Sequence, residues 1–287
     1  MERYKMKGLE IATERGTVLN GVIFDAEGGA DTVVIGIHGN FYSNPFYFNI
    51  GDTLSANSID FIYAQTNDAF GQIETYNAKT GAKELIGSCN ERFSYTEEDI
   101  NAYLKFAEKS GYKHIILVGH SLGANKVIYY LSRNHDTKKP EHFLFLSLAN
   151  LTYMMNNVTD YEKEVIRRMV SYGQGDKILP FYFMGWVECT ANTANDWLSG
   201  TLNNVHTEVD GDFSQVAQIT HTGAMVIGTY DNFTCGDPAK FLQNINNHMP
   251  TSAENKLIFI EKTGHTYQQK EQEIADIILK TVNDWIV

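Results

Sequence analysis

The sequence predicts an α/β protein with a mostly parallel sheet, crossover helices on both faces of the sheet, and a small helical cap. Short continuous apolar runs alternate with helical patterns along most of the chain, as strands buried on both faces do. This alternation is interrupted once, between residues 150 and 224. With 287 residues and 43% hydrophobic content, the chain suits one domain with an insertion better than two independent domains.

The expected strands and helices follow one another in a regular order. Residues 8–16 and 18–29 alternate in polarity and end in glycine, which favours an antiparallel pair. Further strands are expected at residues 32–37, 60–64, 114–118, 142–148, 224–229 and 256–260. Helices are expected at residues 45–56, 96–109, 122–132, 238–247 and 269–286. Strands that alternate with helices in this way predict a parallel sheet with crossover connections.

The break in the alternation of strands and helices between residues 150 and 224 predicts an inserted segment. It contains a helix-like piece at residues 161–171 and an aromatic stretch at residues 177–200. A structureless loop of this length is improbable in a compact domain. We therefore expect a cap, or lid, at residues 151–216, set over the carboxyl edge of a core domain formed by residues 1–150 and 217–287. A cap in this position would enclose a substrate.

Charge and composition exclude several classes of partner. The 35 acidic and 23 basic residues give a formal net charge of −12, and no tract is rich in lysine or arginine. Neither nucleic acid nor an anionic membrane is therefore expected as a partner. No run approaches the ~18 apolar residues needed to span a bilayer, and the first residues contain no apolar signal segment. We expect a cytoplasmic protein.

No motif indicates a cofactor or a metal. The three cysteines, Cys89, Cys189 and Cys235, fit neither a disulfide framework nor a CxxC metal site. The sequence contains no P-loop, no glycine-rich dinucleotide motif after the first strand and no metalloprotease motif. We therefore expect no cofactor and no metal, and a small molecule as the partner; the oligomeric state is left open.

The sequence HIILVGHSLGANKVIYYLS, residues 114–132, contains a candidate nucleophile. Ser121 stands between Gly119 and Gly123, after a buried strand and directly before a helix, which is the context of a nucleophile elbow. Only small residues fit two positions before and after so tight a turn. The backbone N–H of Leu122 could then donate to an oxyanion at the helix N-terminus. The alternative is that Ser121 is only a helix N-cap.

A serine nucleophile needs a base and an acid, which are expected downstream in the order serine, acid, histidine. Asp231 follows the expected strand AMVIGTY, and His265 follows the strand KLIFIEK. Both positions lie where strand ends meet loops, at the same sheet edge as Ser121. Asp237 is a rival acid, but it immediately precedes Pro238 and is more typical of a helix N-cap.

Most of the other histidines can be discounted by position. His120 precedes Ser121, so its side chain is expected to point away from the hydroxyl group. His38 begins the loop after an earlier strand. Others lie at a strand start, after helices, or in or next to the expected cap: His114, His135, His206, His221 and His248.

A second oxyanion donor is expected in the loop after residues 32–37. Gly39 would let the backbone turn so that the N–H of Asn40 or Phe41 faces Ser121. The alternative is a simple glycine turn before a helix. The substrate pocket is expected to involve Tyr42 from this loop and three aromatic residues of the cap, which could also be plain cap core: Tyr153, Trp186 and Trp197.

Together, these motifs resemble those of α/β-hydrolase-fold serine hydrolases, an esterase- and lipase-like superfamily with a helical cap insertion. The similarity extends from HGN at residues 38–40 through GHSLG at 119–123 and GTYD at 228–231 to GHTY at 264–267. Residues 91–131 are also similar to a poorly characterised group of single-domain hydrolases. The resemblance implies a catalytic triad of Ser121, Asp231 and His265. It implies the oxyanion loop less directly, because esterases often have more glycine where this chain has Asn40 and Phe41.

The expected reaction is hydrolysis of a carboxylic ester through an acyl-enzyme, with a small or medium apolar or aromatic acyl group. A thioesterase, a lactonase or an acyltransferase would use the same triad. The resemblance also permits a C–C bond lyase. A different class of function, a non-catalytic small-molecule binder, would place a ligand in the same fold.

Overall fold

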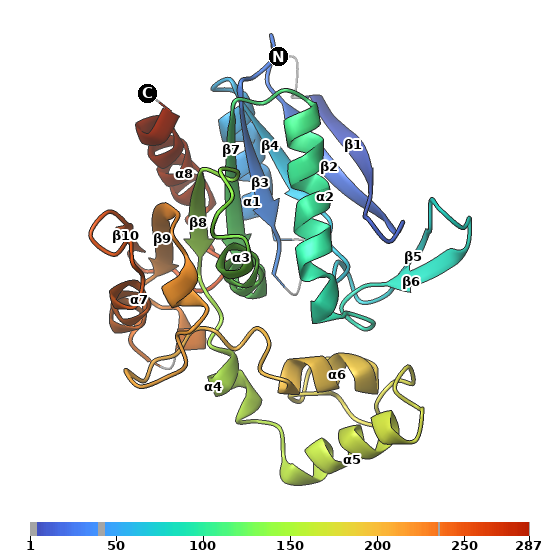
Figure 1. Cartoon of the computed structure of the whole chain (residues 1–287). Coiled ribbons are helices and arrows are strands. Elements are labelled where there is room, and N and C mark those ends of the chain that lie inside the picture. The colour runs from blue at the N-terminus through green and yellow to red at the C-terminus, as the bar shows by residue number, and fades with distance from the viewer. Residues whose placement is uncertain (1–4, 40–43, 235, 287) are drawn as a thin grey trace.

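A central sheet organises the computed structural model, which describes residues 5–39, 44–234 and 236–286 (Figure 1). Its eight strands lie in the spatial order β1-β2-β4-β3-β7-β8-β9-β10. They are β1 (Lys5–Ala12), β2 (Val18–Asp25), β3 (Thr32–Ile37), β4 (Ile59–Ala64), β7 (His114–His120), β8 (His142–Leu146), β9 (Thr222–Gly228) and β10 (Lys256–Ile260). β2 pairs antiparallel with β1 and β4, and the other pairs are parallel. The predicted antiparallel pair and mostly parallel sheet are confirmed.

Helices cover both faces of the sheet. α1 (Phe46–Ser55) and α8 (Glu271–Ile286) pack on one face, and α2 (Thr96–Lys109), α3 (Leu122–Arg133) and α7 (Pro238–Asn247) on the other. Along β3, Val33 and Ile35 enter the core beneath α2 and α3, whereas Val34 enters the core beneath α1 and α8. Because successive side chains of a strand point to opposite faces, the continuous apolar runs fill both cores.

Helix starts follow from local capping chemistry. The Asp237 carboxylate accepts a hydrogen bond from the Lys240 N–H at 3.0 Å, and Pro238 occupies the first turn of α7. Asp237 is therefore the N-cap that the sequence predicts. At the start of α5 (Asp160–Ser171), Thr159 and Glu162 form a reciprocal capping box, which satisfies backbone N–H groups at that end.

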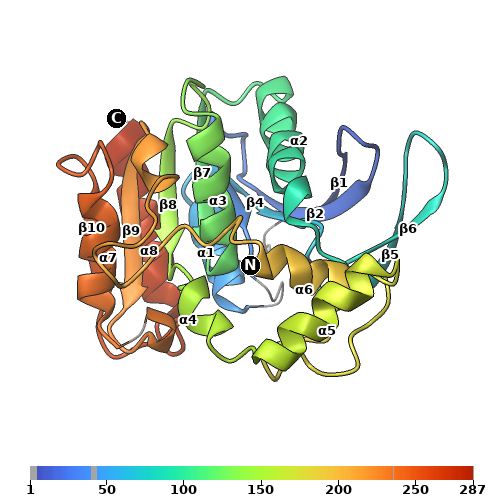
Figure 2. The ribbon, with the colours of Figure 1, turned by 60° about the horizontal axis from the view of Figure 1, so that its bottom comes forward.

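The long interval between β8 and β9 contains α4 (Leu151–Met155), α5, α6 (Ala191–Leu198) and the short 3₁₀ helix η2 (Val216–Gln218). Figures 1 and 2 show α4, α5 and α6 beyond the end of the sheet from which β8 leaves. Phe183 and Trp197 of this interval share an apolar cluster with Phe93 and Leu122. The interval thus packs onto the rest of the chain, and its assignment as a separate cap at residues 151–216 stays a prediction.

A hairpin between β4 and α2 has no counterpart in the sequence analysis. β5 (Ile73–Tyr76) and β6 (Lys83–Ile86) form a two-stranded antiparallel sheet that stands out from the body in Figures 1 and 2. The strands are short and only partly buried, so they lack the continuous apolar run that marks the central strands. Two further 3₁₀ helices, η1 (Phe93–Tyr95) and η3 (Asn232–Thr234), complete the described elements.

Candidate active site

The turn that carries Ser121 depends on backbone contact that only glycine allows. Ser121 adopts φ 55° and ψ −128°, outside the regions that side chains normally favour, and α3 begins at the next residue. A Cβ atom on Gly119 would lie 2.6 Å from the Ala124 Cα, and one on Gly123 would lie 2.3 Å from the His38 carbonyl oxygen. The flanking glycines therefore let β7, α3 and the end of β3 meet around Ser121.

Ser121, His265 and Asp231 form a continuous hydrogen-bonded chain. His265 Nε2 lies 2.7 Å from Ser121 Oγ, and His265 Nδ1 lies 2.9 Å from Asp231 Oδ2. The carboxylate can only accept, so Nδ1 carries the proton and Nε2 is left to accept the serine hydroxyl proton. The three residues follow β7, β9 and β10, so the parallel strands bring them together from distant parts of the chain.

Asp231 is enclosed yet favours its ionised form. Its side chain is buried, and its Oδ1 accepts a hydrogen bond from the Phe233 N–H at 2.9 Å. Burial alone would raise the pKa of this carboxyl group. Hydrogen bonding to His265, the charge of that residue, and the Phe233 N–H donor outweigh burial and hold the pKa of Asp231 below its ordinary value. A negative charge therefore faces the His265 ring.

The loop that carries His265 is held by contacts that sequence analysis did not identify. A Cβ on Gly228 would lie 2.3 Å from the Thr263 carbonyl oxygen, so the end of β9 and this loop touch through glycine. The Tyr267 hydroxyl donates to the Val226 carbonyl oxygen at 3.1 Å and accepts from Ser147 Oγ at 3.0 Å. Tyr267 in GHTY was the available signal, because a buried tyrosine needs a partner for its hydroxyl.

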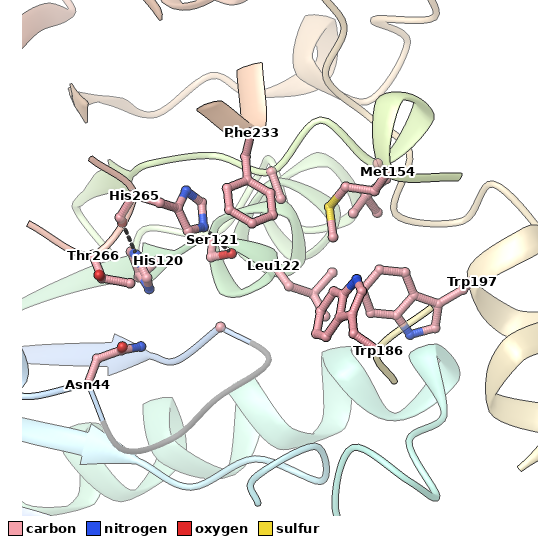
Figure 3. A pocket seen from close by; sticks show the side chains of 13 residues that line it. Asn44, His120, Ser121, Leu122, Met154, Trp186, Trp197, Phe233, His265 and Thr266 are labelled. Carbon is pink, nitrogen blue, oxygen red and sulfur yellow. Dashed lines mark hydrogen bonds between the residues drawn. The ribbon is translucent and has the colours of Figure 1, made fainter. Parts of the chain in front are cut away.

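An apolar cavity opens at Ser121 and His265 (Figure 3). It has a volume of about 70 Å³, and none of the described residues that line it is Asp, Glu, Lys or Arg. Figure 3 shows Trp186 and Trp197 at one end, and Asn44 and Thr266 at the other. The apolar side chains that line it are Leu122, Ala149, Leu151, Met154, Trp186, Trp197 and Phe233.

The predicted pocket residues have different environments. Trp186 is 42% exposed and lines the cavity, whereas Trp197, only 3% exposed, lines it and also packs against Phe93 at 5.6 Å between ring centroids. Trp197 therefore belongs to both the pocket and the core. Tyr153 is half-exposed and is not among the described residues that line the cavity. Tyr42 lies outside the described residues.

Only one of the three predicted oxyanion donors lies within the described residues. Leu122 is the first residue of α3, where backbone N–H groups have no carbonyl partner within the helix, and it lines the cavity. Gly39 approaches Ser121 so closely that a Cβ at position 39 would lie 2.8 Å from the serine Cβ. The other expected donors, Asn40 and Phe41, lie outside the described residues.

A buried charge cluster adjoins this site. Lys126, on the same helix face one turn after Leu122, places Nζ 2.7 Å from Asp68 Oδ2 and 2.5 Å from Glu91 Oε1, and all three side chains are buried. Asp68 Oδ1 also lies 3.5 Å from Nε2 of His38, which precedes Gly39. The cluster thus joins α3 to the loops after β3 and β4 and to the segment before η1.

Charge balance decides how this cluster ionises. Burial raises the pKa of Glu91 to about 8. The positive charge of Lys126 lowers this pKa, but the negative charge of Asp68 offsets part of that effect. Burial alone would also raise the pKa of Asp68, but Lys126 and His38 lower it. One ammonium group and one carboxylate are then charged, and Glu91 holds a proton near neutral pH. Sequence spacing contains no signal for this cluster.

The described part of the chain contains neither a cluster suited to a metal ion nor a helix suited to a bilayer. Within residues 5–39, 44–234 and 236–286, no group of three or more His, Cys, Asp or Glu side chains is arranged to hold a metal ion. Over the same residues, no helix combines the length and the apolarity that crossing a bilayer requires.

The strand order, the glycine-flanked serine turn and the placement of Asp231 and His265 after parallel strands define an α/β-hydrolase fold. Solved structures of similar proteins agree with this fold. A protein-family model described as "Protein of unknown function (DUF1749)" matches residues 86–218. No curated protein matches the sequence of this chain.

Solved structures with this fold resemble nearly the whole chain. Est1E from Butyrivibrio proteoclasticus, with bound ferulic acid, is 16% identical, with a TM-score of 0.65 over 96% of this chain and 98% of its own. The α/β hydrolase GrgF from Penicillium sp. sh18 is 15% identical, with a TM-score of 0.68 over 97% and 96%. The esterase EaEST from Exiguobacterium antarcticum is 15% identical, with a TM-score of 0.62 over 96% and 100%. The predicted α/β-hydrolase fold is confirmed.

We predict that Lys126→Met lowers the free energy of unfolding by about 3–5 kcal/mol, because Asp68 would remain buried as an uncompensated charge. Urea denaturation measures this change. Lys105→Met is the control, since Lys105 is largely exposed and its change should cost less than about 0.5 kcal/mol. Equal unfolding free energies for both variants would show that the cluster contributes nothing to stability.

Proposed function

We propose that the protein is a serine hydrolase that cleaves carboxylic esters through an acyl-enzyme. The observation that supports this most is the hydrogen-bonded chain from Ser121 through His265 to Asp231 at the mouth of an apolar cavity. A serine hydroxyl is a weak nucleophile unless a base removes its proton, and a base works best when a third group orients it. The esterases among the structures of similar fold favour the same reaction.

In the proposed mechanism, Ser121 Oγ attacks the ester carbonyl carbon while His265 Nε2 takes the hydroxyl proton. Asp231 keeps the ring in the required tautomer and stabilises the imidazolium that forms. His265 then gives the proton to the departing alkoxide, the C–O bond of the ester breaks, and the alcohol leaves. Water, deprotonated by His265, attacks the acyl-enzyme and releases the carboxylic acid and free Ser121.

The oxyanion of each tetrahedral intermediate is assigned to backbone donors. The Leu122 N–H belongs to the first turn of α3, where unpaired donors and the helix dipole favour negative charge. The N–H of Asn40 or Phe41 is the proposed second donor, since Gly39 brings this loop against Ser121. A preorganised pair of donors of this kind contributes several kcal/mol to transition-state stabilisation.

The lining of the cavity supports an uncharged, apolar or aromatic acyl group. His265 must protonate the leaving alcohol, so the alcohol is assigned to the end near Thr266 and Asn44. The acyl group then faces Trp186, Trp197 and Met154 at the opposite end. The cavity presents no positive side chain among its described residues to a charged carboxylate. The ferulic acid bound to Est1E is an aromatic acid of this kind.

A fluorophosphonate probe should label the protein once, at Ser121, because the probe reports an activated serine. Ser121→Ala should abolish labelling and lower ester turnover by a factor of about 10⁴ to 10⁶. Intact-protein mass spectrometry and a panel of esters measure the two effects. If the folded wild-type protein reacts with neither the probe nor the esters, a small-molecule binding function replaces the proposal.

Asp231→Asn should lower turnover by about 10⁴, because an amide no longer holds the His265 ring in the tautomer that accepts the serine proton. The matched control is Asp237→Asn, which keeps an N-cap side chain on α7 and should leave turnover unchanged. Steady-state kinetics on one ester compare the two variants. Similar turnover in both would remove Asp231 from the mechanism.

Trp186→Ala should change the preference between a short and an aromatic acyl ester by tens of fold, since pocket contacts of this size are worth about 1–3 kcal/mol. The ratio of kcat/KM for the two esters measures this preference. Tyr182→Ala is the control, because Tyr182 is exposed and does not line the cavity. A uniform fall for both esters in the Trp186 variant would assign that residue to packing alone.

A further inference from the structure

His120, the last residue of β7, is buried directly beside Ser121 and contacts the loop of His265. Its Nε2 lies 2.8 Å from the backbone carbonyl oxygen of His265 (Figure 3). A carbonyl oxygen only accepts, so Nε2 carries the proton and donates it. The His120 side chain lines the cavity, and its hydrogen bond joins it to His265, whose ring contacts the Ser121 hydroxyl.

The other ring nitrogen of His120 has no hydrogen-bond partner among the described residues. Nδ1 is buried, and the ring stands edge-on to Phe46 at 4.9 Å and to Tyr47 at 5.9 Å between centroids. Burial, reinforced by the charge of His265, lowers the pKa of His120 to about 3, so the ring is neutral at ordinary pH. A buried unpaired nitrogen costs roughly 1–3 kcal/mol. A phenylalanine would fill this aromatic site without that cost.

Packing alone therefore does not explain why this position is a histidine. The hydrogen bond that Nε2–H donates to the His265 carbonyl oxygen does explain it. His265 lies in the connection between β10 and α8, outside any helix or strand. Among the described residues, His120 provides the one side-chain hydrogen bond to the His265 main chain. Because His120 immediately precedes Ser121 in the chain, this hydrogen bond connects the main chain at His265 to the main chain at Ser121.

We propose that His120 is a positioning residue that holds His265 at hydrogen-bonding distance from Ser121. The proposal rests on the proposed hydrolase function. Proton transfer requires the ring and the hydroxyl to keep the 2.7 Å contact, and displacement by about 1 Å can lower the rate about 10²-fold. A neutral His120 serves this role well, because a positive charge there would oppose formation of the His265 imidazolium during the reaction.

The test compares His120→Phe, which keeps the aromatic volume and removes the donor, with His120→Gln, whose side-chain amide can reach the same carbonyl. The control is His142→Phe, since His142 stacks on Trp285 at 4.5 Å at the start of β8, away from the cavity. For each variant, kcat and KM for one small ester, the rate of fluorophosphonate labelling and the free energy of unfolding are measured.

We expect His120→Phe to lower kcat and the labelling rate by roughly 10- to 100-fold, with KM little changed and the free energy of unfolding not lowered. His120→Gln should recover part of this loss, and His142→Phe should match the wild type. Wild-type kcat in His120→Phe, or equal losses in His120→Phe and His120→Gln, would overturn the positioning role while the hydrolase function stands. A wild-type protein that is not labelled at Ser121 would overturn both.

Discussion

The site depends on one constraint, the close approach of β7, α3 and the end of β3 around Ser121. A serine at φ 55° costs about 1–3 kcal/mol, so the surrounding structure must hold it there. The contact of Gly123 with the carbonyl oxygen of His38 and that of Gly39 with Ser121 supply this support. The same contacts bring the loop after β3 and the first N–H groups of α3 to the serine. A single packing arrangement thus brings together the proposed nucleophile and the first turn of α3.

The buried side chains of Asp231 and Glu91 show how neighbouring groups determine whether a carboxyl group is ionised. Asp231 accepts hydrogen bonds from His265 and Phe233, and these donors keep its pKa low despite burial. Glu91 shares the single ammonium group of Lys126 with Asp68, and burial raises its pKa to about 8. In the proposed mechanism, the ionised Asp231 contacts the catalytic base His265. The neutral Glu91 lies in the buried cluster with Lys126, next to the site. Burial without enough donors favours the protonated form.

Sequence patterns predicted the elements and residues whose signals are local. The central strands are continuous apolar runs because both faces of the sheet are covered, and Ser121 stands in a motif whose glycines the backbone contact requires. Asp231 and His265 follow from strand order, since parallel strands end at one edge. The hairpin of β5 and β6 was missed because its strands are short and half-exposed.

Features built from distant residues could not be predicted from the sequence. Lys126, Asp68 and Glu91 meet only after folding, and their spacing along the chain has no characteristic pattern. Position predicted that the side chain of His120 points away from the serine hydroxyl, but not that it would reach the His265 carbonyl oxygen. Trp197 packs in the core and also lines the cavity. The sequence could therefore not assign it to one of these two roles.

The central claim is that Ser121 becomes covalently acylated during turnover. The most direct measurement mixes the protein with p-nitrophenyl acetate, follows p-nitrophenol release on the millisecond scale, and maps the acid-quenched protein by peptide mass spectrometry. We predict a burst of p-nitrophenol no larger than one equivalent per active site and an acetyl group on the peptide that contains Ser121. Turnover with the acetyl group on a different residue, or with Ser121 never acylated, would contradict it.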